Sequence, residues 1–165
     1  MTIWADGDSL QAEIRSLLER RTESETSRAG ASGKPSPWRL RYVAAKELRV
    51  ARWAELLIVE AGPEAADDRL VELAEAGDLA VTRDLPLAER LAEKGVVVLN
   101  DRGEVFDSTN VRERRSLRDR AAELRAMGLA PDSPRKRSWG KRELKEFADA
   151  LDRELTRIGK NALRE

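Results

Sequence analysis

The stretch GDLAVTRDLPLAERLAEKGVVVLN, residues 77–100, decides the fold, because it holds a strand, a helix and a second strand in close succession. The apolar run Leu79–Thr82 predicts the first strand. Residues Pro86–Lys94 have helical spacing, and Gly95 is a typical helix end. The run Val96–Leu99 predicts the second strand. Two strands joined by such a crossover helix run parallel.

The same alternation continues on both sides of this stretch. Further strands are predicted at Thr2–Ala5, Trp38–Ala44 and Leu56–Val59, and further helices at residues 10–21, 65–75, 110–127 and 141–160. The helix at 110–127 is expected to begin with a capping box of Asn110 and Glu113, and the helix at 141–160 is amphipathic. Residues 22–37, rich in Ser, Thr, Gly and Pro, are predicted to form a flexible loop. The pattern predicts one α/β domain over residues 1–165, with a parallel, doubly wound sheet covered on both faces.

The composition excludes several kinds of chemistry. The chain has 165 residues, of which 41% are hydrophobic and 38% charged, with no cysteine and no histidine. Disulfides, the usual zinc sites, thiol nucleophiles and imidazole bases are therefore excluded. No apolar stretch approaches the ~20 residues of a membrane span, and no export signal opens the chain, so we expect no membrane partner and a cytoplasmic location.

The charges are unevenly distributed although the net charge is zero. Residues 1–53 carry ten basic and seven acidic side chains, residues 54–111 five and fourteen, and residues 112–165 sixteen and ten. An acidic centre between basic flanks suits a metal site beside a phosphate-binding surface. A solvated surface of ion pairs explains the charges alone more simply.

Aspartates follow the predicted strands where each strand ends. Asp6 and Asp8 come after the first strand, Asp67 and Asp68 a few residues after the third, and Asp84 just after the strand at 79–82. The carboxyl ends of parallel strands share one edge of the sheet, where ligands bind. Carboxylates gathered there repel one another unless a cation joins them. A hard divalent ion, Mg²⁺ or Mn²⁺, is the usual partner.

Two other interpretations of these aspartates remain open. Asp6-Gly7-Asp8 is similar to the first motif of haloacid-dehalogenase-type phosphatases, with Asp6 as nucleophile and Asp8 as acid. That interpretation needs a Gly-Asp pair after a later strand, whereas Gly77-Asp78 precedes its strand. Turns and helix caps also favour aspartate, and they explain any one of these positions alone.

Motifs along nearly the whole chain resemble the YaiI/YqxD family of bacterial proteins. They are Ile3-Trp4-Ala5-Asp6-Gly7-Asp8, Ala65-Ala66-Asp67-Asp68, the block 77–88, Lys94-Gly95, Asn100, Arg102-Gly103-Glu104, Asn110-Val111, Arg118-Asp119, Leu124–Gly128 and Phe147 with Leu151-Asp152. The resemblance implies a fold similar to the PIN-like nuclease superfamily, a three-layer α/β/α sandwich with a mainly parallel central sheet. Active members of that superfamily hold Mg²⁺ or Mn²⁺ on acidic residues and hydrolyse phosphodiesters. By position, Asp6, Asp67 and Asp84 match their acidic residues, and Asp8 matches the family's second aspartate.

The chain departs from the family pattern near its first strand. The usual Asp-Ala-Asp-Ala-Cys-Pro is Asp6-Gly7-Asp8-Ser9-Leu10-Gln11, and an asparagine that often ends the second strand is Ala45. The acidic residues are kept, but these differences put the substrate contacts in doubt.

We therefore predict a metal-dependent nuclease that acts on RNA or single-stranded nucleic acid. Asp6 and Asp84 would ligate the ion directly, and Asp8 and Asp67 would complete its shell. The ion would lower the pKa of the attacking water, since the chain has no histidine that could activate this water as a base. The alternative is a PIN-like module that binds metal, RNA or protein without cleavage.

Neighbouring polar side chains are predicted to contact the substrate. Ser9 or Thr82 would bind a phosphate oxygen or orient a carboxylate, although Thr82 is also explained as a buried strand residue bonded to backbone. The substrate backbone is expected to be held by Arg83, Arg112, Arg114 and Arg115. The cluster Arg135-Lys136-Arg137 with Trp139 is interpreted as an exposed connector, and Trp4, Trp38 and Trp53 as packing residues.

Overall fold

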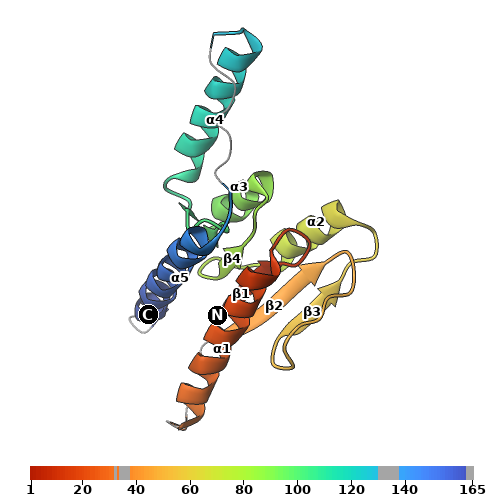
Figure 1. Cartoon of the computed structure of the whole chain (residues 1–165), viewed down its shortest axis with the longest axis vertical. Helices are drawn as coiled ribbons and strands as arrows, with labels where there is room; N and C mark the ends of the chain where they lie inside the picture. Colours follow the sequence, from red (N-terminus) through yellow and green to blue (C-terminus); the bar gives the residue numbers. More distant parts are fainter. Residues whose placement is uncertain (32, 34–37, 130–137, 163–165) are drawn as a thin grey trace.

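A six-stranded sheet forms the centre of the molecule in the computed structural model, which describes residues 1–31, 33, 38–129 and 138–162 (Figure 1). The strands are β1 (Thr2–Asp6), β2 (Arg39–Ala44), β3 (Glu55–Ile58), β4 (Leu79–Val81), β5 (Val97–Leu99) and β6 (Val105–Phe106). Their order in the sheet is β3-β2-β1-β4-β5-β6. All neighbours pair in parallel except β5 and β6, which are antiparallel. β1 and β4, adjacent at the centre, bring their carboxyl ends to one edge.

Helices cover both faces of this sheet. They are α1 (Ala12–Ala31), α2 (Pro63–Leu73), α3 (Leu85–Glu93), α4 (Val111–Ala126) and α5 (Lys141–Ala162). α1 and α5 pack on one face, and α2 and α3 on the other. Figure 1 shows α4 extending away from the rest of the molecule. The predicted α/β fold with a mainly parallel sheet is confirmed, and its layers are those of a three-layer α/β/α sandwich.

The two faces follow from the alternation of side chains along each strand. In β1, Ile3 and Ala5 pack in the core beneath α1 and α5, whereas Trp4 packs in the core beneath α2 and α3. In β4, Leu79 and Val81 alternate with Ala80 in the same way. Because both faces are buried, the central strands are apolar throughout.

The prediction of a loop over residues 22–37 is wrong for its first part. α1 continues to Ala31, and residues 32 and 34–37 lie outside the described part of the chain. The hydroxyl of Thr22 donates to the carbonyl oxygens of Leu18 and Glu19, and that of Thr26 donates to the carbonyl of Thr22. These local bonds satisfy the side chains within the helix, so a polar composition does not interrupt it here.

Two smaller expectations need correction, and one strand was not predicted. The apolar run Leu56–Val59 lies at the edge strand β3 and is covered only partly on each face, since Leu56 packs against one core and Leu57 against the other, while Ile58 is 43% exposed. The short antiparallel strand β6 was not predicted. Asn110 precedes α4 but makes no side-chain capping bond, because its oxygen accepts the Asp107 N–H and its amide donates to the Val105 carbonyl.

The remaining helix predictions hold. The predicted apolar side of the last helix is buried at Phe147, Leu151, Leu155 and Ile158. None of the helices in the described part of the chain combines the length and apolar composition needed to cross a membrane.

Candidate functional site

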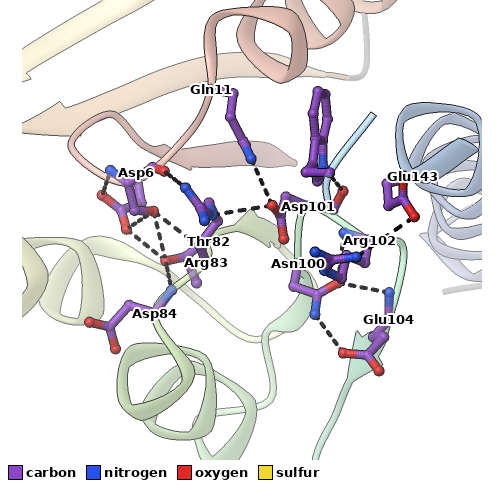
Figure 2. Close-up of polar contacts among 12 residues, drawn as sticks. Asp6, Gln11, Thr82, Arg83, Asp84, Asn100, Asp101, Arg102, Glu104 and Glu143 are labelled. Atoms are coloured by element: carbon purple, nitrogen blue, oxygen red, sulfur yellow. Dashed lines mark hydrogen bonds and ion pairs between the residues drawn. The ribbon is translucent and has the colours of Figure 1, made fainter. Parts of the chain in front are cut away.

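Asp6 is the centre of a hydrogen-bond network at the carboxyl edge of the sheet (Figure 2). Its side chain ends β1 and is 4% exposed. One oxygen, Oδ1, accepts the N–H groups of Asp8 and Ser9 at 3.2 and 3.3 Å. The other, Oδ2, accepts the hydroxyls of Ser9 and Thr82, both at 2.6 Å. Four donors match the roughly four lone-pair positions of a carboxylate, so Asp6 is fully satisfied inside the protein.

Thr82 joins the ends of β1 and β4. Its hydroxyl donates to Asp6 and accepts the N–H of Asp84 at 3.0 Å. Thr82 is thus buried and bonded to backbone, as one interpretation expected, and its hydroxyl also contacts a carboxylate, as the other expected. Ser9 has the same part, because its hydroxyl donates to Asp6 and accepts the N–H of Arg83 at 3.1 Å.

Asp84 and Asp8 each use one oxygen in a local backbone bond. Asp84 Oδ1 accepts the N–H of Leu87 at 2.9 Å and caps α3, so the capping interpretation of this residue is correct. Asp8 Oδ2 accepts the N–H of Ala45 at 2.7 Å, which ties the loop after β2 to the loop after β1. The second oxygen of each carboxylate makes no hydrogen bond within the described residues.

Asp67 faces the other three aspartates from α2. Its pKa is raised to about 6, first by burial, then by the charges of Asp6 and Asp84 and, to a smaller extent, Asp8. The positive charge of Arg90, which also pairs with Asp68 at 2.7 Å, lowers the pKa of Asp67 but does not offset the rise. The carboxylates from three separate segments therefore interact electrostatically, and their repulsion favours the protonated, uncharged form of Asp67.

Within the described residues, these aspartates do not form a complete set of metal ligands. Among the residues that the structure describes, no group of three or more acidic side chains is placed to hold one ion. Figure 2 shows the Asp84 carboxylate turned away from Asp6. Asp68, which also follows the third strand, forms an ion pair with Arg90 at the surface.

A cavity of about 570 Å³ opens beside the network. Asp8, Ser9 and Asp84 line one side of it, and the turn between β5 and β6 lines the other. Arg83 spans the two sides, since its Nε lies 3.2 Å from Asp101 Oδ2 and its Nη1 donates to the Ser9 carbonyl at 3.4 Å. The prediction that Arg83 lies at the sheet edge near the aspartates agrees with this placement.

The sequence interpretation missed the turn between β5 and β6. Asp101 is 6% exposed and accepts both Arg83 and the amide of Gln11, the latter at 2.8 Å (Figure 2). Asn100 holds the turn, because its oxygen accepts the N–H groups of Arg102 and Glu104. The sequence did contain a signal for this turn, because Asn100 and Asp101 directly follow the apolar strand β5. Asp84 was found by the same pattern, a few residues after β4.

The structure does not bring the α4 arginines to this cavity. Arg114 stacks over the ring of Phe106 at 4.7 Å, and Arg115 lies 3.9 Å from Glu89 and 3.6 Å from Glu93 on α3. Arg112 lines a different cavity together with Arg115. Their expected contact with a substrate at the aspartates has no support in this arrangement.

The tryptophans mostly fill the core, as expected. Trp4 and Trp38 are buried, and Trp139 packs against the core while its Nε1 donates to the Asp101 carbonyl at 2.9 Å. Trp53 differs, because it is 38% exposed. Residues 135–137, the predicted basic connector, lie outside the described part of the chain.

Comparison with known proteins agrees with the resemblance found in the motifs. The family model described as "Uncharacterized BCR, YaiI/YqxD family" matches residues 31–157. A UPF0178 protein of Myxococcus xanthus (strain DK1622) is 39% identical over 162 residues, which cover 97% of each chain. A UPF0178 protein of Treponema pallidum (strain Nichols) is 37% identical over 160 residues, or 96% of this chain and 83% of the relative. With this similarity over nearly its full length, the chain belongs to the YaiI/YqxD family.

Proposed function

We propose that this protein is a divalent-metal-dependent nuclease that hydrolyses phosphodiesters in RNA or single-stranded nucleic acid at the carboxyl edge of its sheet. The observation that carries the proposal is Asp67, whose pKa is raised to about 6 partly by the charges of three other aspartates. Selection for stability alone does not favour a carboxylate in such a place. The proposal includes the similarity to the PIN-like superfamily implied by the family motifs.

The donors suit a hard ion in their chemistry. All are carboxylate oxygens, and Asp67 makes no hydrogen bond with either oxygen within the described residues. Free oxygens also remain on Asp8 and Asp84. Because no three acidic side chains are now placed as ligands of one ion, binding requires these three to turn toward one another.

In this proposal Asp6 does not ligate the ion directly, in contrast to what was expected from the sequence. All of its acceptor positions are taken, so it would act by its charge unless the hydroxyl of Ser9 or Thr82 turns away. Asp8, Asp67 and Asp84 would then be the direct ligands of Mg²⁺ or Mn²⁺. A bound ion supplies an activated water and polarises the scissile phosphate.

The chain's own residues would place the substrate. Arg83 lies at the cavity between the aspartates and the β5–β6 turn, where its guanidinium would bind a phosphate oxygen. The ion pair with Asp101 and the bond to the Ser9 carbonyl hold Arg83 in this position before any ligand binds. Phosphate contacts of this kind position a strand and do not select its sequence.

The test is incubation of the full chain with Mn²⁺ and labelled RNA and DNA oligonucleotides, beside the variants Asp67→Asn and Asp84→Asn. We expect both variants to fold. Asp67 has no hydrogen bond to lose within the described residues, and at position 84 asparagine caps a helix about as well as aspartate. We expect cleavage by the parent and its loss in both variants. Cleavage that survives in both, or that EDTA does not stop, contradicts the proposal.

A second candidate function is binding of nucleic acid or protein without cleavage. It is favoured by the saturation of Asp6 and by the lack, in the described residues, of a ready metal shell. Oligonucleotide binding by a parent that never cleaves, with any divalent ion, supports this candidate. The phosphatase interpretation loses support, because Asp78 lies at the opposite edge of the sheet and bonds to the N–H of Thr2 and the indole of Trp4.

A further inference from the structure

A second cavity, of about 370 Å³, lies between the first half of α1 and the loop that follows β2. Its polar lining comes from Arg15, Ser16 and Glu19 of α1 and from Arg49 of the loop. This cavity is separate from the one beside Arg83, and the sequence interpretation gave its arginines no function.

Both arginines of this cavity lack a carboxylate partner. The Nε atom of Arg15 is buried and has no hydrogen-bond partner, and Arg15 makes no ion pair within the described residues. Arg49 is exposed and has neither an ion pair nor a side-chain hydrogen bond in that part of the chain. A half-buried guanidinium without a counter-ion costs free energy that a bound anion would recover.

Glu19, the carboxylate in this cavity, is engaged elsewhere. It accepts the hydroxyl of Tyr42 at 3.4 Å and the N–H of Ala51 at 3.1 Å. These bonds fix the end of the loop to α1 through one oxygen, Oε1, and within the described residues Glu19 forms no ion pair with either guanidinium group. The cavity therefore offers the guanidinium groups of Arg15 and Arg49 to a ligand, while one oxygen of Glu19 is held by hydrogen bonds within the protein.

The cavity is joined to the aspartates by the loop over residues 45–54. This loop starts at Ala45, whose N–H donates to Asp8. Leu48, a few residues further along, occupies the space that a side chain at Gly7 would need. α1 starts a few residues after Asp8. In the sheet order, this loop follows β2 and Arg83 follows β4, so the two lie on opposite sides of β1, the strand that ends at Asp6.

We propose that Arg15 and Arg49 bind a phosphate group of single-stranded nucleic acid, next to the phosphate held at the aspartates. The identity of the ligand rests on the proposed function, because a strand that crosses the acidic edge must place neighbouring phosphates on either side of it. Planar guanidinium groups match phosphate oxygens in geometry. Lys46 and Arg52 add positive charge to the same loop, and Trp53, 38% exposed, offers a face on which a base can stack.

The test measures binding without cleavage. The full chain is titrated against a fluorescein-labelled single-stranded RNA of about twelve nucleotides in EDTA, across about 50 to 200 mM salt. The variant is Arg15→Ala with Arg49→Ala. The matched control is Arg142→Ala with Arg153→Ala on α5, where both side chains are more than 60% exposed and the same charge is removed.

We expect the variant to bind about tenfold more weakly than the parent at low salt. Two lost phosphate contacts also reduce the slope of log affinity against log salt by about 1.4. The control is expected to keep nearly the parent affinity and slope. Equal behaviour of variant and control, or a parent that binds no oligonucleotide in EDTA, overturns the inference.

Arg49→Ala alone keeps the test valid if the double variant folds poorly, because Arg49 is exposed and its side chain has no hydrogen bond or ion pair to lose within the described residues. The slope of this single variant should fall by about 0.7. The proposed function fails separately. A parent that binds in EDTA with the expected slopes but never cleaves in Mn²⁺ contradicts the nuclease and leaves this phosphate site in place. A parent that cleaves, with a double variant that binds and cleaves like the control, contradicts this phosphate site alone.

Discussion

The two edges of the sheet use aspartate in opposite ways. At the amino edge, Asp78 is 9% exposed and is surrounded by donors, since it accepts the N–H groups of Thr2 and Glu75 and the indole of Trp4. At the carboxyl edge, Asp67 has no such donor and its pKa is raised to about 6 by burial and by other aspartates. The hydrogen bonds of Asp78 stabilise the fold, whereas burial and repulsion penalise the ionised form of Asp67. This contrast separates the two carboxylates more clearly than burial does, and it is the reason that Asp67, and not Asp78, belongs to the proposed site.

The largest expected effect comes from Asp78→Ala. The substitution leaves three buried or half-buried donors unpaired, so the free energy of unfolding should fall by about 3–5 kcal/mol. Chemical denaturation measures it. A loss below about 1 kcal/mol would show that Asp78 is no anchor and would remove one side of the comparison.

Thr82→Val is expected to have the next largest effect. Valine keeps the shape of threonine but removes the hydroxyl that donates to Asp6 and accepts the Asp84 N–H. Stability should fall by about 1–2 kcal/mol. Ser108→Ala, at an exposed hydroxyl outside this network, is the control and should change stability by less than about 0.5 kcal/mol.

Asp67→Asn should have the opposite sign from Asp78→Ala. It removes a charge that Asp6, Asp8 and Asp84 repel, so thermal unfolding at pH 8 should show a gain of about 1 kcal/mol. Solvent around the half-buried side chain keeps the gain this small. Isothermal titration should show that the same variant loses Mn²⁺ binding. A less stable variant that still binds Mn²⁺ contradicts both parts.

The smallest effect concerns pH. The pKa of Asp67 lies at about 6 in the folded chain and at 3.8 in its ordinary state, so its contribution to stability is present below about pH 4 and is lost as pH rises through 6. Bound Mn²⁺ favours the ionised form, so binding at pH 6 should release protons and binding at pH 8 should not. Titration calorimetry in buffers of different ionisation enthalpy detects this release. Equal proton release at both pH values would exclude Asp67 as its source.

The sheet could be predicted from the sequence because its central strands are buried on both faces. The runs at β1, β4 and β5 are apolar without interruption, and their carboxyl ends located Asp6, Asp8 and Asp84. The second half of α1 was missed, because Thr22 and Thr26 satisfy their hydroxyls within the helix. Local propensity does not report such bonds.

The substrate contacts were harder to predict, because they depend on directions that the sequence does not contain. Arg112, Arg114 and Arg115 follow a strand that lies in the sheet, yet α4 leaves the body and directs them to Glu89, Glu93 and Phe106. Arg15 and Arg49 are far apart in the sequence, and only the fold brings them to one cavity, where neither forms an ion pair within the described residues. Asp101, in contrast, follows β5 after a single residue, so its place at the carboxyl edge is present in the sequence pattern.

The bond between Thr82 and Asp6 joins residues 76 positions apart, and that between Ala45 and Asp8 spans 37. No short fragment of the chain can therefore assemble the acidic edge, and during synthesis it cannot form until α3 has left the ribosome. Closing such distant contacts is slow relative to helix formation. The proposed nuclease centre would thus stay incomplete near the messenger RNA that the chain is translated from until the sheet is nearly complete.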